Sequence, residues 1–487
     1  MPSSLAIFYG AVVTPVSVDN YAALPRALLC VNSSGLIEWV VDDVEPHRLQ
    51  DELASKGLVD VEVVDLKDGE FLMPGFIDTH THAPQYPNMG TGGQFQLLDW
   101  LEKVTFPMEA KFEDTSFARD VYSSVVRRVL DAGTTTCCYY GTLHLEATKI
   151  LAEVINQAGQ RAFVGKCNMD RNSPAYYVEP SPQVSKENTE HLINFIRSLS
   201  KPPFLSAPSH HPLVQPILTP RFAISCTDEL LSSLEAVASS DPSLRIQTHI
   251  SENPAEIEFT LSLFPKASSY AGIYDHFKLL RNNTILAHGV HLTNEELDLI
   301  KQRGAGISHC PTSNFNLSSG VAPVGVMLDK DIKVGLGTDV SGGFSLSILK
   351  TIQDASIAAK VRSINHREDS NIGTSPSKFA NKPLPIPTLL YLATAGGASV
   401  CDLEHHVGKL EVGKNFDALL VSIREEGTEL NPGIWGNGLG RPKAASLKER
   451  KALLDTQLER FLFGGDDRNI RRVYVQGKLV GGTVFSM

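Results

Sequence analysis

The feature that most constrains this chain is an alternation, beginning at Met73, of short apolar runs with segments of helical periodicity. Each apolar run is bounded by Gly, Pro or Ser, and helical patterns such as residues 116–131 and 145–157 lie between the runs. Strands that alternate with helices in this way form parallel sheets, in which both faces of each strand are buried. The pattern therefore predicts a succession of β–α units.

Eight segments are candidate strands of this parallel sheet: Phe71–His82, Thr134–Tyr140, Arg161–Met169, Ile217–Ile224, Leu244–Ile250, Thr284–Gly289, Ala305–His309 and Lys333–Thr338. Eight β–α units over about 330 residues suit an α/β fold of the (β/α)8 TIM-like barrel type with insertions. A doubly wound open sheet is the alternative. Because no G-x-G-x-x-G motif follows the first candidate strand, the barrel is favoured.

The two ends of the chain have a different pattern, with short strands broken by turns. Asn32–Gly35 separates two apolar runs and indicates a hairpin, and a second hairpin is expected at Gln476-Gly477. Each terminal segment is too short to form a stable sheet alone. We therefore expect a small β-sandwich domain built from residues 1–72 and 404–487, beside a barrel domain of residues 73–403.

Composition and charge exclude several classes of partner. Lys and Arg number 44 and Asp and Glu number 55, a formal charge of −11. This acidic balance, without a long basic run, argues against nucleic acid or an anionic membrane as the partner. No window is apolar enough for a membrane helix, and the seven cysteines include no C-x-x-C spacing. We expect a soluble cytoplasmic protein with free thiols.

Two histidines close the first candidate strand. His80 and His82 lie two residues apart in the run PGFIDTHTH, and side chains two apart on a strand point to the same side. Active sites of barrels form at the carboxyl ends of the strands. Imidazole is a good ligand for zinc or iron. We interpret the pair as part of a metal site; two polar residues that simply end a strand are the alternative.

The fifth and sixth candidate strands also end in histidines, His249 and His288. Helix-start signals follow soon after each strand, at Asn253–Glu256 and Thr293–Glu296. The strand-to-helix turns are therefore short and hold these side chains, together with Glu252, at the mouth of the barrel. We expect Glu252 to be exposed there, where a carboxylate can relay protons beside a metal-bound water. A solvated loop glutamate is the alternative.

Asp339 ends the eighth candidate strand, within GLGTDVSGG. A carboxylate in this position is a metal ligand, a general base or a helix cap, and capping is the commonest role of a single Asp. Five metal-suited side chains at the same end of four strands are a stronger signal than any one of them alone. We therefore expect these five to converge: His80, His82, His249, His288 and Asp339.

Motifs of other hydrolytic sites are missing from the sequence. There is no P-C-x-x-C of the cytidine-deaminase type, no H-E-x-x-H and no G-x-S-x-G. The fourth candidate strand runs into Pro220-Arg221-Phe222 and offers no lysine to bridge two ions. A single metal ion is favoured.

Taken together, these motifs resemble the amidohydrolase superfamily, whose metal signature corresponds to PGFIDTHTH, the two later histidines and GTD. Within it, several blocks are similar in order and spacing to the family of guanine deaminases: HTHAPQY, LLDWLEKVTFPME, TPRFAIS, THISEN, LAHGVHLT, SHCPTSN and GLGTDVSGG. The resemblance covers nearly the whole chain, including the terminal segment VGKNFDALLV. It departs in segments 198–212, 362–384 and 425–460, which we interpret as solvated surface loops.

The resemblance implies a hydrolase acting on C–N bonds of cyclic amidines, which converts guanine and water to xanthine and ammonia in purine salvage or catabolism. One zinc ion would be bound by His80, His82, His249 and Asp339, and iron is possible because the ligand set suits both. Asp339 would accept a proton from the activated water, His288 would orient that water, and Glu252 would protonate the ring nitrogen. The family resemblance also implies a homodimer.

The same resemblance assigns three residues to the substrate. Gln85 would hydrogen-bond the purine edge, Arg221 would donate to the carbonyl oxygen, and Phe222 would cover the ring. For Arg221, a surface charge paired with a nearby acid is the alternative. Two other functions stay open here. A related deaminase or chlorohydrolase would act on another heterocycle, and a non-catalytic scaffold would be expected to have lost metal ligands that this chain retains.

Overall fold

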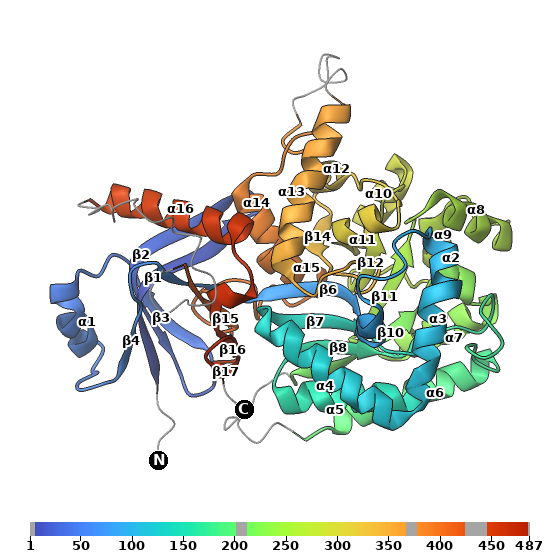
Figure 1. Ribbon diagram of the computed structural model, residues 1–487, viewed down its shortest axis with the longest axis horizontal. Helices are drawn as coiled ribbons and strands as arrows, with labels where there is room; N and C mark the ends of the chain where they lie inside the picture. The colour runs from blue at the N-terminus through green and yellow to red at the C-terminus, as the bar shows by residue number, and fades with distance from the viewer. Residues whose placement is uncertain (1–4, 201–211, 367–376, 424–445, 486–487) are drawn as a thin grey trace.

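The computed structural model describes residues 5–200, 212–366, 377–423 and 446–485. Two bodies of β-structure lie side by side: a barrel surrounded by helices, and a sheet built from both ends of the chain (Figure 1). Parts of the three expected surface loops, residues 201–211, 367–376 and 425–445, lie outside the described residues. The loop expected up to residue 460 was wrong from residue 447 onward, where α16 (Leu447–Gly464) begins and buries Leu458 and Phe461.

The barrel is formed by parallel strands in the order of the chain: β6 (Phe76–His82), β7 (Thr134–Tyr140), β8 (Arg161–Gly165) with its continuation β9 (Cys167–Asn168), β10 (Val214–Pro220), β11 (Arg245–Ile250), β12 (Thr284–His288), β13 (Gly306–His309) and β14 (Lys333–Leu336). The pairing of β14 with β6 and of β10 with β11 closes the ring. The predicted (β/α)8 barrel is therefore confirmed.

Helices cover the outside of the barrel and connect its strands: α4 (Thr115–Asp131), α5 (Leu145–Ala158), α6 (Pro182–Ser198), α7 (Asp228–Ser240), α8 (Pro254–Leu263), α9 (Tyr270–His276), α10 (Asn294–Arg303), α11 (Pro311–Asn316), α12 (Val324–Asp329) and α13 (Ile348–Asn365). In α4, Ala118, Tyr122, Val125 and Val129 recur at helical spacing and are buried against the strands. None of the helices in the described ranges is long and apolar enough to span a membrane.

The expected first strand, Phe71–His82, is two strands. β5 (Glu70–Pro74) pairs with β1 (Ala6–Ser17) and β15 (Ala418–Ser422) in the terminal sheet, whereas β6 belongs to the barrel. The chain changes sheet at Gly75, where a Cβ would lie 2.2 Å from the side chain of Thr135. An apolar run does not reveal a change of sheet, so a single strand was the wrong prediction. We retain the division into two domains, expected at 72/73 and 403/404, as a proposal, with the first boundary moved to Gly75 because Met73 and Pro74 still pair with β15.

The terminal sheet has the order β17 (Lys478–Gly481), β16 (Ile470–Val475), β15, β5, β1, β2 (Asn20–Val31), β3 (Ile37–Val41), with β4 (Val63–Asp65) also paired to β1. The sheet is strongly curved. The ring centroid of Phe8 lies 4.9 Å from that of Phe416 and 5.7 Å from that of Tyr474, although β1 and β16 are not adjacent strands. Both expected hairpins are confirmed, with Gly35 (φ 79°) and Gly477 (φ 74°) in the left-handed region that their turns require.

A buried ion pair joins the two bodies. Asp417, just before β15, accepts hydrogen bonds from Nε (2.9 Å) and an Nη (3.2 Å) of Arg161 at the start of β8, and from the backbone N–H of Gln476 (2.7 Å). Both side chains are almost fully buried. Because neither charge reaches solvent, each depends on the other.

We expect Asp417→Asn to lower the free energy of unfolding by about 3–5 kcal/mol, because it leaves the Arg161 guanidinium buried without its counter-charge. Urea unfolding followed by circular dichroism measures the loss. The matched control is Glu153→Gln, which removes the exposed ion pair with Arg119 and should cost no more than about 1 kcal/mol. Equal losses in the two variants would contradict the role of burial.

Candidate metal centre and active site

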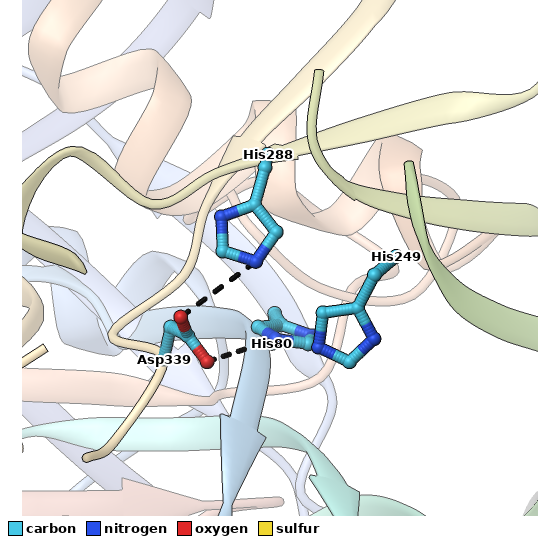
Figure 2. Close-up of side chains that lie close together, drawn as sticks. All are labelled: His80, His249, His288 and Asp339. Atoms are coloured by element: carbon cyan, nitrogen blue, oxygen red, sulfur yellow. Dashed lines mark hydrogen bonds and ion pairs between the residues drawn. The ribbon is translucent and has the colours of Figure 1, made fainter. Parts of the chain in front are cut away.

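Three histidines and an aspartate meet at the carboxyl end of the barrel. His80 belongs to β6, His249 to β11 and His288 to β12, and Asp339 follows β14. One ligand atom from each lies within 4.8 Å of the others (Figure 2). Oδ1 of Asp339 is 3.0 Å from Nε2 of His80, and Oδ2 is 3.7 Å from Nε2 of His288. Groups as far as 259 positions apart in the sequence thus converge.

His82 completes this cluster. Its Nε2 lies 3.2 Å from Nε2 of His249 and 3.4 Å from Oδ1 of Asp339. The Nδ1–H of His249 donates to the backbone carbonyl of Arg221 at 2.5 Å, so its Nε2 presents a lone pair toward His82. Imidazole nitrogens that face each other beside a carboxylate form the donor set of a cation site. The arrangement therefore fits a metal ion.

The protonation states are also those of metal ligands. Desolvation lowers the pKa of His80, and it lowers the pKa values of His82 and His249 still further, with help from the neighbouring histidines. Burial of Asp339 acts in the opposite sense, but the charge and hydrogen bond of His80, together with His288, hold the pKa of this carboxyl well below its ordinary value. Neutral imidazoles and an ionised carboxylate are the forms that bind a divalent ion.

His288 and Glu252 form a second pair beside this cluster. Nε2 of His288 lies 3.3 Å from Oε2 of Glu252, while its Nδ1–H donates to Oδ1 of Asn314 at 2.9 Å. Ser319 donates its hydroxyl to Oε1 of Glu252 at 3.0 Å. Burial raises the pKa of Glu252. Burial would lower the pKa of His288, but the charges of Glu252 and Asp339 outweigh it and raise that pKa. The pair is therefore built to hold a proton.

Glu252 is buried, not exposed as its position in a turn led us to expect. Its exposed fraction is 2%. Glu256, in the first turn of α8, accepts hydrogen bonds from the backbone N–H groups of Glu252 (2.9 Å) and Asn253 (3.3 Å), which confirms the expected capping box. The segment that carries Ser319 covers the carboxylate from the other side. Sequence alone places a residue in a turn but does not show what packs over the turn.

Several residues in and beside the site have an unusual backbone conformation. Ser251, His288 and Asp339 have φ values of 47°, 76° and 46°, in the left-handed region that non-glycine residues rarely adopt. Each stands at or just after the end of a barrel strand. Such conformations persist only where the surrounding structure holds them, and they are concentrated at functional sites.

The residues expected to contact substrate lie in one cavity with this cluster. The walls of this cavity include Gln85, Arg221 and Phe222 with Trp100 and Leu101. The ring of Phe222 lies 6.2 Å from that of His249. The walls thus combine apolar side chains with polar and charged groups that include Gln85 and Arg221 as well as the histidines. This is the usual form of a small-molecule site.

A residue that the sequence analysis did not single out, Glu109, organises one side of the cavity. It lies at the end of the short helix α3 (Phe106–Glu109) and forms a two-point ion pair with Arg221, with N–O distances of 2.7 and 3.1 Å. Arg221 is therefore paired with an acid, but in the interior and not at the surface. The signal available in the sequence was a glutamate that directly follows the apolar run FPM. Asn314 and Ser319 carried no comparable signal.

The comparisons with known proteins agree with this site. The family model of the amidohydrolase family matches residues 71–480. The chain belongs to the amidohydrolase family. Its sequence is 41% identical to the guanine deaminase of Dictyostelium discoideum, over 98% of each chain, and 40% identical to that of Mus musculus, over 98% of this chain and 97% of the other.

Among solved structures, the guanine deaminase of C. acetobutylicum with guanine bound in its active site has a TM-score of 0.80 and is 34% identical, with coverage of 98% of this chain and 100% of that one. The resemblance to guanine deaminases inferred from the motifs is thereby confirmed. A more distant solved structure, an adenosine deaminase of Xanthomonas campestris with bound zinc, is 21% identical with a TM-score of 0.76 and shares the fold.

We expect His80→Ala and His249→Ala to lose most of the bound metal, because each removes one nitrogen from the converging set. Elemental analysis of the purified proteins measures the metal-to-protein ratio. His276→Ala, which changes an exposed histidine on α9, is the control and should retain the wild-type ratio. Full metal occupancy in both cluster variants would contradict the ligand assignment.

Proposed function

We propose that this protein catalyses the hydrolytic deamination of guanine to xanthine and ammonia, in purine salvage or catabolism. The observation that carries the proposal is a single cavity whose walls include His82, His249, His288, Glu252 and Asp339 together with Gln85, Arg221 and the apolar side chains of Trp100, Leu101 and Phe222. The full-length similarity to guanine deaminases, including one with guanine bound, supports the choice of substrate.

The metal we propose is one zinc ion per chain, held by His80, His82, His249 and Asp339, with iron as the alternative. When bound, such an ion lowers the pKa of a coordinated water toward neutrality, which supplies a nucleophile at physiological pH. His288 also lies within reach of these ligands. We assign it to the attacking water because its Nε2 faces Glu252 and Asp339 at 3.3 and 3.7 Å, which places the imidazole between the two carboxyl groups.

The two carboxyl groups take opposite parts in proton transfer. Asp339, which the histidines keep ionised, accepts the proton of the attacking water. Glu252, whose pKa burial raises, donates a proton to the ring nitrogen next to the carbon under attack. The proton held by Asp339 then passes to the amino group, which leaves as ammonia, while the new hydroxyl gives a proton back to Glu252 as the carbonyl forms. Neighbouring carboxyls whose pKa values are driven apart are the usual acid and base of one reaction.

The substrate end of the cavity suits a neutral purine that carries a carbonyl oxygen. Arg221 and Gln85 present N–H donors, and Glu109 neutralises the charge of Arg221. Phe222 and Trp100 cover the flat faces of the ring. Adenine presents an amino group where guanine has its carbonyl, which would leave buried donors unmatched, so weak activity toward adenine is expected.

Guanine turnover and metal content measured on one preparation test the proposal. We expect loss of guanine absorbance, formation of xanthine and release of one ammonia per xanthine. A related reaction on another heterocycle is the second candidate, because distant relatives of this fold include triazine hydrolases. A panel of guanine, adenine, cytosine and a chlorinated triazine separates the two, and a preference for any substrate other than guanine would overturn the assignment.

Glu252→Gln should retain metal and guanine binding but lose turnover by about 10²–10⁴-fold, since the amide has the shape of the carboxyl but cannot donate its proton. Steady-state kinetics and equilibrium binding of guanine check the two parts. Glu258→Gln, on the exposed side of α8, is the control and should behave as wild type. Near-normal turnover in Glu252→Gln would show that another group moves this proton.

Two further parts of the proposal rest on resemblance to the family. We propose that the protein is a homodimer and that it acts in the cytoplasm. Light scattering of the purified protein tests the first, with twice the chain mass of 53.0 kDa as the expected result. Fractionation of cells followed by the guanine assay tests the second.

A further inference from the structure

Glu109 lies at the centre of the hydrogen bonds beneath the substrate end of the cavity. Its side chain is fully buried and accepts four hydrogen bonds. Oε1 accepts from Gln85 at 2.8 Å and from one Nη of Arg221 at 3.1 Å, and Oε2 accepts from the other Nη at 2.7 Å and from the hydroxyl of Tyr177 at 2.7 Å. These four bonds use all the lone-pair positions of a carboxylate, so Glu109 has no acceptor left for a substrate.

The partners of Glu109 come from different connections of the barrel. Gln85 follows β6, Arg221 follows β10, and Tyr177 lies in the segment between β9 and α6. Glu109 itself lies in the long connection between β6 and α4. One carboxylate therefore ties together segments that would otherwise be held only by their own short turns.

The bonds to Glu109 also determine which atoms of Gln85 and Arg221 remain for a ligand. The amide of Gln85 is fixed at both ends, since its oxygen accepts from the backbone N–H of Ser341 at 3.1 Å. Arg221 uses one N–H of each terminal nitrogen on the carboxylate, and its Nη1 also faces the sulfur atoms of Cys167 (3.9 Å) and Met169 (3.8 Å), so the second N–H of Nη2 and the Nε–H remain for a ligand. Both residues line the cavity. Glu109 therefore holds the remaining N–H groups of both residues in place, and it neutralises the charge of Arg221.

We propose that Glu109 is a positioning residue that determines the preference of this site for a 6-oxopurine. The inference rests on the proposed function and deepens it. Arg221 favours binding of a carbonyl oxygen only when Glu109 holds the guanidinium in one orientation and neutralises its charge. Without Glu109, a mobile buried cation would favour no particular ring substituent.

The ratio of kcat/KM for two substrates distinguishes a positioning role of Glu109 from a general loss of active-site structure. 2-Aminopurine carries the amino group that leaves but lacks the carbonyl oxygen of guanine, so it makes no use of the Arg221 donors. Positioning groups that support an active-site residue are worth about 10–100-fold. For Glu109→Gln we therefore expect kcat/KM for guanine to fall by about 10–100-fold, mostly through KM, while that for 2-aminopurine falls less than about threefold.

The controls distinguish this effect from loss of structure. Asp417→Asn removes one charge of another buried ion pair, whose partner Arg161 is at the start of β8. This variant should leave the ratio of kcat/KM for guanine to that for 2-aminopurine unchanged. Metal content should equal that of wild type in every variant. If Glu109→Gln does not fold, Glu109→Asp serves as the test variant in its place. Its shorter side chain cannot reach Arg221 and Gln85 together, so the guanine to 2-aminopurine ratio should fall at least about threefold.

A double variant tests whether Glu109 acts through Arg221. In an Arg221→Met background, Glu109→Gln should change kcat/KM for guanine by less than about twofold, because the residue it positions is gone. Equal losses on guanine and 2-aminopurine, or losses that multiply in the double variant, would overturn the inference. A wild-type protein that turns over neither purine would instead refute the proposed function, and this result is available before any variant is made.

Discussion

The structure depends on one constraint, the burial of an ionised carboxylate among histidine side chains at the rim of a closed barrel. Asp339 is stable there as an anion only because His80, His82 and His288 surround it. The three imidazoles in turn require a cation or shared protons to balance their facing nitrogens. Barrel closure makes this possible, since it brings the ends of β6, β12 and β14 to one rim.

Around that rim, a second set of residues holds the reactive groups in place. Asn314 sets the tautomer of His288, Ser319 and Glu256 hold Glu252, and Glu109 holds Arg221. Each of these supports comes from a helix or loop and not from a barrel strand. The strands thus give the site a rigid base, while residues in the connections between strands set the orientation and protonation of the reactive side chains.

Much of the fold and of the metal cluster followed from local patterns. The apolar run of β7 and the helix start signals of α8 and α10 are short-range features, so they predicted element positions to within a residue or two. His80 and His82 could be placed on one side of a strand by its two-residue period. By contrast, the switch of sheets at Gly75 and the burial of Glu252 arise from contacts with distant segments, which no local pattern encodes.

The sequence by itself determined the number of β–α units, the residues that end the strands and the chemical kind of site they form, because strand period and turn chemistry are local. Only the tertiary structure decided that Arg221 is neutralised in the interior by Glu109, 112 positions away, and that Tyr177 and Gln85 join the same carboxylate. A buried charge selects its partner by distance in space, and that distance exists only once the chain has folded.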